Sequence, residues 1–211
     1  MTQVDEAVTR QPPDLSFTRG LRRKHEAVPT ILQMEATECG AASLAMVLAH
    51  YGKWVPLEDV RVECGVSRNG ANAKSIVVAA RRYGLTASGV SLDLPNLPDE
   101  QFPLIAHWNF DHFLVVEGTS RKGVFVNDPG RGRWLVPWEE VDRSLTGLVL
   151  RLAPGPDFQR GGRRPSLRAG LSWRLSGVGK GLAYLVAAGL AIAVPTLLSP
   201  MALQAFVDQF L

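Results

Sequence analysis

The sequence predicts an α+β domain, with a helical half first and an antiparallel sheet second, followed by a transmembrane helix. Three observations carry this prediction. Apolar residues recur at helical spacing up to about residue 84, whereas from residue 104 they form short runs between turn residues. Helices that precede strands in this way are typical of α+β domains. Beyond residue 180 a long stretch has no charged residue.

Length and composition exclude several classes of protein. The chain has 211 residues, of which 46% are apolar and 20% are charged, which suits one globular domain with additional segments. Its two cysteines, Cys39 and Cys64, are too few for a disulfide framework. A net charge of +3 is too small for a nucleic-acid binder, so we expect no nucleic-acid partner.

Residues 1–28 are polar, carry charges of both signs and include Pro12 and Pro13. Since they show no sustained apolar period, we expect a mobile N-terminal tail. They also lack an apolar stretch behind a basic start, so they do not resemble a secretory signal. The domain that follows is therefore expected in the cytoplasm, where thiols stay reduced.

Three helices are expected in the first half, over residues 39–50, 57–64 and 73–83. The first has an apolar face at helical spacing, formed by Ala41, Leu44, Ala45 and Leu48. Gly52 and Gly84 follow the first and third helices at the position where glycine commonly ends a helix.

The second half predicts an antiparallel sheet, because short apolar runs alternate with glycine, proline and asparagine turns. A short helix over residues 138–145 is expected to interrupt it. The predicted strands are residues 104–108, 113–117, 124–127, 134–137 and 148–152.

The end of the chain predicts a membrane anchor. No acidic residue occurs between Asp157 and Asp208, and residues 181–207 carry no charge. At ~1.5 Å per residue, this stretch is longer than the ~30 Å hydrocarbon core requires. Pro195 and Pro200 would kink the helix, which membrane helices tolerate. The alternative is a buried helix of a soluble protein, but so small a domain rarely hides one of this length. Because the basic flank precedes the span, the N-terminal domain is expected on the cytoplasmic side.

Leucines recur every four residues among the arginines before the span, at Leu167, Leu171 and Leu175. This pattern predicts a basic amphipathic helix on the membrane surface; a solvated linker is the alternative. The expected divisions of the chain are a tail over 1–28, a globular domain over 29–153, a basic linker over 154–180, a transmembrane helix over 181–207 and an extracytoplasmic end over 208–211.

Cys39 is the first residue that suggests chemistry. It begins the first predicted helix, where the positive end of the helix dipole favours a thiolate. Cys64 lies late in a helical stretch and is expected to be structural. Buried cysteines are common, so Cys39 needs further residues to support a catalytic role.

His112 and Asp128 are the further residues that support a catalytic role for Cys39. His112 opens one predicted strand and Asp128 closes the next, and a hairpin with its turn near Ser120 pairs residue 112 with residue 128. Opposed residues hold their Cβ atoms ~4.5–5.5 Å apart, so the carboxylate can orient the imidazole. Register could slip, because both faces of this hairpin are mostly apolar.

A thiol, an imidazole and a carboxylate suit a cysteine nucleophile with its base and orienting group. A helix that carries the thiol against a sheet that carries the base is the papain-like arrangement. An acyl-transfer site also needs donors for the oxyanion. Gln33, six residues before Cys39, could provide one with its side-chain amide, and the Cys39 backbone N–H could provide the other.

A metal site is the competing interpretation of these residues. His107 and His112 are five residues apart, flank a turn and come without a CxxC pair, so we expect no metal. The side chains that could in principle hold zinc are Cys39, His107, Asp111, His112 and Asp128.

Three segments resemble the double-glycine leader peptidases, papain-like domains at the N-terminus of bacteriocin-processing ABC transporters. They are residues 33–46 (QMEATECGAASLAM), 112–116 (HFLVV) and 127–129 (NDP). The resemblance covers residues 29–153, and the basic linker and apolar span lie where that family has its first transmembrane helix. Residues 108–113 and 161–166 are most similar to the branch that exports peptides with nitrile-hydratase-like leaders.

The resemblance implies a papain-like cysteine peptidase that cuts a leader peptide after Gly-Gly or Gly-Ala. It implies Cys39 as the nucleophile, His112 as general base and then acid, Asp128 as its orienting group and Gln33 as the oxyanion donor. It implies no cofactor for the peptidase itself.

It further implies a bacterial inner-membrane protein, with a leader-bearing precursor peptide, a transporter core and an ATP-binding domain as partners, and a homodimer when complete. This sequence has no G-x-x-x-x-G-K-[ST] phosphate-binding loop, so ATP would act only through a domain absent from this chain. We therefore expect a fragment, a truncated gene product or a single-span protein. The alternative function is a silent docking module, but such related domains lack the cysteine.

Overall fold

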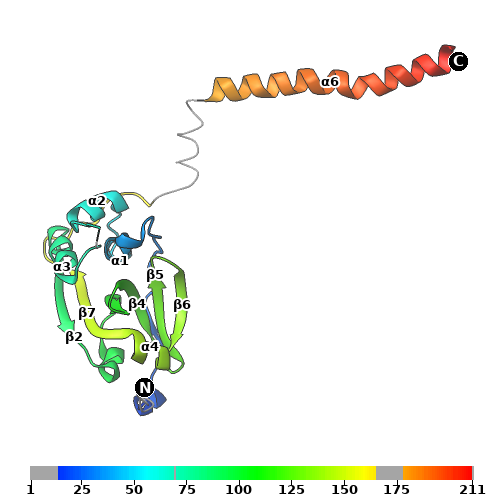
Figure 1. The fold of residues 1–211 in the computed structure, drawn as a ribbon. Helices are drawn as coiled ribbons and strands as arrows, with labels where there is room; N and C mark the ends of the chain where they lie inside the picture. Colours follow the sequence, from blue (N-terminus) through cyan, green and yellow to red (C-terminus); the bar gives the residue numbers. More distant parts are fainter. Residues whose placement is uncertain (1–13, 69, 165–177, 211) are drawn as a thin grey trace, which may run out of the picture. The chain divides into compact units, whose positions relative to one another are not determined.

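The computed structural model describes residues 14–68, 70–164 and 178–210. The chain divides into two compact units, Met1–Arg163 and Arg164–Leu211. The first contains three principal helices and an antiparallel sheet, and the second contains one long helix (Figure 1). The predicted α+β class with a C-terminal apolar helix is confirmed.

All three early helices are present as α1 (Cys39–His50), α2 (Leu57–Glu63) and α3 (Ala73–Arg82). The last two end one residue before the predicted position. Gly52 and Gly84 have φ of +89°, the left-handed conformation in which glycine ends a helix at low cost. These helices gather at one end of the unit (Figure 1).

One seven-stranded antiparallel sheet forms the rest of the unit, in the order β2-β7-β3-β4-β5-β6, with β1 paired to β4. Strand β3 has the predicted bounds, whereas β1 and β2 are not predicted. The helix predicted over residues 138–145 is present as α4 (Trp138–Ser144). The strands are β1 (Lys24–His25), β2 (Leu85–Ser91), β3 (Leu104–Trp108), β4 (His112–Ser120), β5 (Gly123–Asp128), β6 (Gly132–Pro137) and β7 (Leu145–Pro154). Short 3-10 helices are η1 (Ser16–Gly20), η2 (Ala36–Glu38) and η3 (Leu94–Asp99).

Helix α1 packs against β4 and is buried from its first residue to Ala49. Its alanines and its one glycine, Gly40, let neighbouring elements approach closely. A methyl group on Gly40 would come within 2.7 Å of the Ile76 side chain in α3. The Ser43 hydroxyl donates to the Phe113 carbonyl at 3.2 Å, which fixes α1 to the start of β4. The packing therefore places residue 39 against the start of β4, at the turn end of the β3–β4 hairpin.

The predicted mobile tail is wrong for residues 14–28, and residues 1–13 lie outside the described part of the chain. Strand β1 pairs with β4, and Val28 is buried and donates its N–H to Glu117 at 2.9 Å. The sequence pattern misses this because the segment covers the fold through backbone pairing and a few apolar contacts rather than a periodic apolar face.

The reason for this docking is a buried carboxylate. Glu117 in β4 is fully buried, and such a group is costly without partners. It accepts hydrogen bonds from Arg133 Nε at 2.6 Å and from Asn127 Nδ2 at 3.1 Å, and it contacts His25 Nε2 at 3.2 Å. Burial raises the pKa of Glu117, but Arg133, the Val28 N–H and Asn127 outweigh it and leave the pKa below its ordinary value.

The β4–β5 hairpin forms, but its predicted register is wrong. Val116 pairs with Val126 and Ser120 with Gly123, so each β5 partner lies at least two residues later than predicted. The turn therefore consists of residues 121 and 122. The pairing register also shifts by one residue at Glu117, between Val116 and Gly118. Apolar residues on both faces give no signal that distinguishes these registers.

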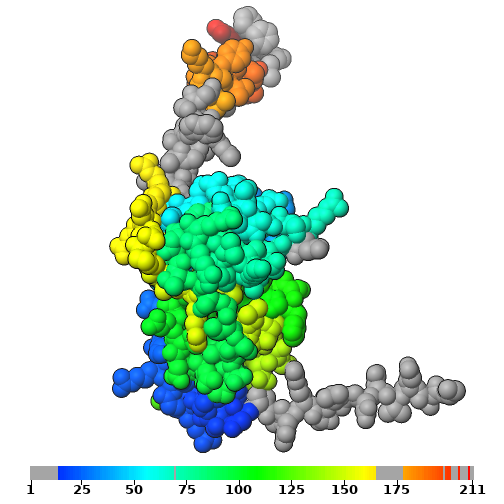
Figure 2. Space-filling model, turned by 90° about the vertical axis from the view of Figure 1, so that its left-hand side faces the viewer, coloured from blue at the N-terminus to red at the C-terminus, as the bar shows by residue number. Residues whose placement is uncertain are grey.

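The predicted domain boundary at residue 153 is also too early. The Gly155 N–H donates to the Gly84 carbonyl at 3.0 Å, and the Trp54 N–H donates to the Gly161 carbonyl at 2.7 Å. Phe158 packs against the core beneath the helices. In Figure 2 this segment, in yellow, lies along the cyan and teal surface of the helical end. Residues 154–163 thus belong to the first unit.

Because residues 14–28 and 154–163 pack on the first unit, two truncated chains should differ in thermal stability. Residues 14–163 keep every partner of Glu117 named above and the contacts of Phe158, whereas residues 29–153 keep Arg133 and Asn127 but lose His25, the Val28 N–H and Phe158. Each hydrogen bond lost from a buried charged group costs ~1.5–3 kcal/mol, so we expect the shorter chain to melt about 10 °C lower. Thermal unfolding followed by circular dichroism measures this, and equal melting temperatures would contradict the boundaries given above.

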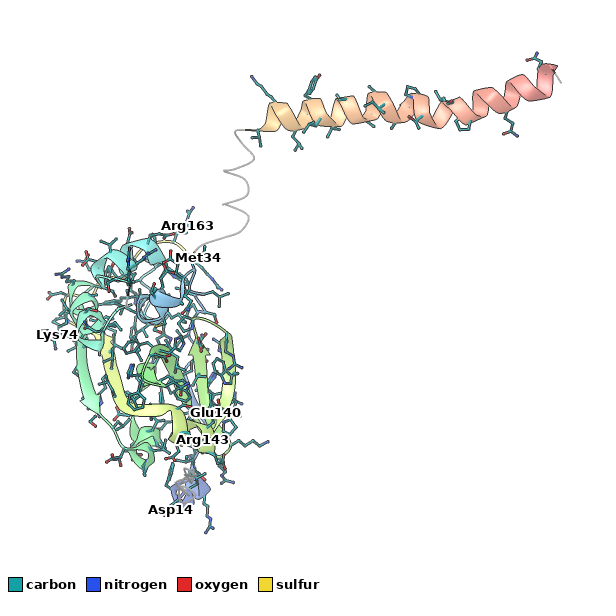
Figure 3. All side chains as sticks on the ribbon, viewed as in Figure 1. Asp14, Met34, Lys74, Glu140, Arg143 and Arg163 are labelled. Atoms are coloured by element: carbon teal, nitrogen blue, oxygen red, sulfur yellow. The ribbon has the colours of Figure 1, made fainter. Side chains whose placement is uncertain are left out.

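The second unit contains α6 (Gly179–Phe210), a continuous helix that includes Pro195 and Pro200. By length and composition, Gly179–Pro200 is apolar enough to cross a membrane. Its drawn side chains project on all sides of the helix (Figure 3). The predicted amphipathic helix around Leu171 lies outside the described residues.

Candidate active site

Cys39 is the first residue of α1 and is 5% exposed. Burial raises the pKa of this thiol. The hydrogen bond with the His112 side chain and the N–H groups of Phe113 and Gly40 lower it by more, so the pKa lies below its ordinary value. The start of a helix adds the favourable end of the peptide dipoles. The site therefore favours a thiolate at residue 39.

His112 is the first residue of β4 and lies between the thiol and a carboxylate. Its Nε2 is 3.0 Å from Asp128 Oδ1, which leaves Nδ1 to face Cys39. The hydrogen bond to Asp128, then that to Cys39, raise the pKa of His112 to about 10 although burial lowers it. A low thiol pKa beside a high imidazole pKa favours a thiolate–imidazolium pair at neutral pH.

Asp128 is the last residue of β5 and is 6% exposed. Its Oδ1 also accepts the Gly130 N–H at 2.6 Å. Burial raises the pKa of Asp128, but the hydrogen bonds with His112 and Gly130 outweigh it, so the group stays ionised. The predicted contact between residues 112 and 128 therefore forms despite the wrong register. A displacement of two residues keeps side chains on the same face, and long side chains still meet diagonally.

Gln33 lies beside the turn that follows Asp128. Its backbone N–H donates to the Pro129 carbonyl at 2.9 Å. A methyl group on Gly130 would lie 3.9 Å from Gln33 Nε2 and 3.3 Å from Asp128 Oδ1. The structure thus joins Cys39, His112 and Asp128 through direct contacts and places Gln33 beside the Asp128 turn.

Cys64 and His107 do not belong to the Cys39–His112–Asp128 group. Cys64 is fully buried at the end of α2, and burial followed by the charge of Glu63 raises its pKa to about 12. His107 contacts the Thr146 hydroxyl at 3.0 Å. Among the described residues, no three histidine, cysteine, aspartate or glutamate side chains gather as metal ligands do.

Two features beside the site were not predicted. Asn109 and Phe110 have φ of +50° and +65°, rare for residues other than glycine, and Phe110 is 81% exposed. The sequence signal for this left-handed turn was Asn109 directly before the strand that carries His112, because asparagine tolerates a positive φ. The second feature is Glu38, a buried carboxylate directly before Cys39.

Residues 27–157 match the model of the peptidase C39 family. The chain belongs to the peptidase C39 family. The match covers the three contacting residues and all described helices and strands of the first unit except η1 and β1. The expected papain-like peptidase fold is confirmed by this match and by the structural neighbours that follow.

Solved structures and curated sequences agree with the C39 assignment. The double-glycine-motif protease of an AMS/PCAT transporter, in complex with its leader peptide, is 55% identical, with a TM-score of 0.61 over 64% of this chain and 96% of that one. The peptidase domain of Streptococcus ComA, a bifunctional ABC transporter, is 27% identical, with a TM-score of 0.57 over 62% and 99%.

The colicin V secretion/processing ATP-binding protein of Escherichia coli is 34% identical over 88% of this chain. The chain spans 27% of that relative's length.

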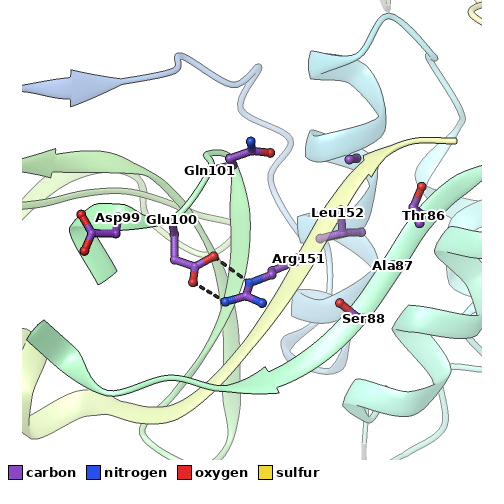
Figure 4. A pocket seen from close by; sticks show the side chains of 9 residues that line it. Thr86, Ala87, Ser88, Asp99, Glu100, Gln101, Arg151 and Leu152 are labelled. Atoms are coloured by element: carbon purple, nitrogen blue, oxygen red, sulfur yellow. Dashed lines mark hydrogen bonds and ion pairs between the residues drawn. The ribbon is translucent and has the colours of Figure 1, made fainter. Parts of the chain in front are cut away.

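A cavity of about 440 Å³ opens in the C39 domain between β2, β7 and the segment after η3 (Figure 4). Arg151 pairs with Glu100 on its wall, with Nε 2.7 Å from Oε2. The cavity is lined by Thr86, Ala87, Ser88, Asp99, Glu100, Gln101, Arg151, Leu152 and Ala153. None of these residues belongs to the Cys39–His112–Asp128 group.

The pKa shifts of this C39 domain predict a bell-shaped dependence of kcat/KM on pH. Activity rises as Cys39 loses its proton, below the ordinary thiol pKa, and falls as His112 loses its proton near pH about 10. Asp128→Asn removes the strongest influence on the His112 pKa, so the alkaline limb should move to lower pH. Peptide cleavage across pH 5–11 measures both limbs. An unmoved alkaline limb in Asp128→Asn would contradict this role.

Proposed function

We propose that this chain is a cysteine endopeptidase that removes a double-glycine leader from a bacteriocin or similar ribosomal peptide. The observation that carries the proposal is the chain of contacts from the Cys39 thiol through His112 to Asp128, within a C39 domain. A domain that only docked its substrate would have no need of a thiol activated by an imidazole. The relatives described as secretion/processing proteins support the same substrate class.

In the proposed reaction the Cys39 thiolate attacks the carbonyl carbon of the second glycine. The Cys39 backbone N–H and the Gln33 amide donate to the oxyanion that forms. His112 then gives its proton to the departing amine, which releases the mature peptide and leaves the leader as a thioester on Cys39. Finally His112 takes a proton from a water molecule whose oxygen attacks the thioester carbon; the C–S bond breaks, which releases the leader with a free carboxyl group and restores the Cys39 thiolate beside protonated His112. Asp128 holds the imidazole in the required orientation throughout.

Two small residues before the cut suit a thiol that is 5% exposed. Glycine has no side chain, so an extended Gly-Gly segment can approach a buried atom where bulkier residues would collide. The specificity therefore follows from limited access to Cys39. The proposed peptidase chemistry requires no metal or organic cofactor, because the nucleophile, base and oxyanion donors are all side-chain or backbone groups.

We further propose that the chain is the N-terminal part of a bacterial inner-membrane ABC transporter. Helix α6 would be the first transmembrane helix, and the arginines before it would keep the peptidase in the cytoplasm. The transporter core and the ATP-binding domain, paired as a homodimer, would use ATP to export the released peptide. The 55% identity to an AMS/PCAT protease supports the nitrile-hydratase-like leader branch.

The test uses the full 211-residue chain in detergent micelles. It is mixed with a synthetic precursor whose leader ends in Gly-Gly, and the products are identified by mass spectrometry. We expect one cut, after the second glycine. A precursor with Val-Val at the same place is the matched control and should stay intact. Binding of the precursor without any cut would contradict the proposed enzyme and favour a docking module.

A further inference from the structure

Glu38 is a buried carboxylate that has no role in the reaction described above. It is 3% exposed and directly precedes the nucleophile. A buried carboxylate is costly unless hydrogen bonds and a counterion satisfy it. A negative charge beside a cysteine also opposes formation of the thiolate. Its presence at this position therefore requires an explanation.

The Glu38 side chain binds backbone atoms of the segment that carries Gln33. Its Oε2 accepts the N–H of Met34 at 2.8 Å and the N–H of Glu35 at 3.0 Å. Its Oε1 pairs with Arg61 Nη1 of α2 at 3.0 Å. The arginine supplies the counterion that makes a buried carboxylate tolerable at this position.

These contacts immobilise the backbone on both sides of Gln33. The Gln33 N–H is bound to the Pro129 carbonyl, beside Asp128. The next two N–H groups are bound to Glu38, beside Cys39. Arg61 also reaches Glu35 at 3.2 Å, so α2 holds the same segment. Met34 marks this segment at the helical end of the unit in Figure 3.

We propose that Glu38, with Arg61 as its counterion, is a positioning residue that holds the Gln33 amide in place relative to the Cys39 thiol. The proposal rests on the proposed function, because it assigns Glu38 to the peptidase reaction through Gln33. Oxyanion donors act by being fixed before charge develops, so a loosened donor loses most of its effect. Glu38 itself touches neither substrate nor thiol in this role.

The test compares Glu38→Ala, Gln33→Ala and the double variant in the full chain. Removing one oxyanion donor lowers kcat by about 10²–10³-fold, and we expect Glu38→Ala to lower kcat by about 10²-fold at unchanged KM. Because Glu38 acts through Gln33, the double variant should be no slower than Gln33→Ala. Glu63→Ala is the matched control, since Glu63 in α2 pairs with Arg82 at 2.8 Å and should leave kcat unchanged.

Alkylation of Cys39 by iodoacetamide separates positioning from folding. The thiol contacts His112, and loss of the Glu38 charge favours the thiolate, so Glu38→Ala should be alkylated at least as fast as the wild type. If Glu38→Ala fails to fold, Glu38→Gln carries the test, because its amide oxygen still accepts backbone N–H groups while the Arg61 pairing is lost. We expect Glu38→Gln to lose about 10-fold in kcat, again without a further loss when combined with Gln33→Ala.

The outcomes distinguish this proposal from the proposed function. A wild-type chain that does not cut the precursor contradicts the peptidase, and the role of Glu38 fails with it. A wild-type chain that cuts, with losses that multiply in the double variant, shows that Glu38 acts independently of Gln33 and overturns only the positioning role. A Glu38→Ala chain as active as Glu63→Ala overturns it as well.

Discussion

Cys39→Ala is expected to abolish cleavage of the precursor while the domain stays folded. The thiolate is the only group proposed to form a bond with the substrate, so its loss should lower kcat by at least about 10⁴-fold. Alanine fits the space of a buried cysteine at the start of α1, where Ala41 and Ala42 are also buried. Precursor cleavage by mass spectrometry and thermal unfolding of the variant measure the two parts.

Cys64→Ser is the matched control for Cys39→Ala. Cys64 is fully buried and lies apart from His112, so its replacement should lower the melting temperature and leave kcat unchanged. If cleavage survives in Cys39→Ala, or disappears in a folded Cys64→Ser, Cys39 is not the nucleophile.

His112→Ala is expected to remove activity to the same extent as Cys39→Ala. Without the imidazole, only the Phe113 and Gly40 N–H groups oppose burial, which is the largest influence on the Cys39 thiol, so its pKa rises and less thiolate remains at pH 7. Alkylation of Cys39 by iodoacetamide at pH 7 should therefore slow by at least about 10-fold. Since the two residues act as a unit, the double variant should be no worse than either single one.

His107→Ala is the control for His112→Ala, since His107 lies on the neighbouring strand and contacts Thr146. It should keep both cleavage and Cys39 alkylation near wild-type rates. Alkylation of His112→Ala at the wild-type rate would show that the imidazole does not activate the thiol.

Local patterns in the sequence predicted much of this fold. Helix α1 and strand β3 have the predicted bounds because each has an unbroken apolar pattern and a clear end, such as Gly52 after α1. The contact of His112 with Asp128 was also predicted, because it depends on which face each residue occupies. The register was wrong, because the position of a tight turn is not set by apolar alternation.

Other features depend on distant partners and could not be predicted from local patterns. Strand β2 is half polar and forms through pairing with β7. Residues 14–28 dock because Val28 and His25 satisfy a carboxylate about 90 residues later in the chain. Glu38 looks like an ordinary acidic residue before a helix until Arg61 and the backbone of residues 34–35 are placed around it.

The most direct test of the central claim is to trap the acyl-enzyme. The full chain is mixed with the Gly-Gly precursor, quenched with acid within one turnover and analysed by mass spectrometry after digestion. We expect the leader joined as a thioester to the peptide that contains Cys39. Cleavage of the precursor with the adduct on Cys64, or with no adduct on any cysteine, would contradict Cys39 as the nucleophile.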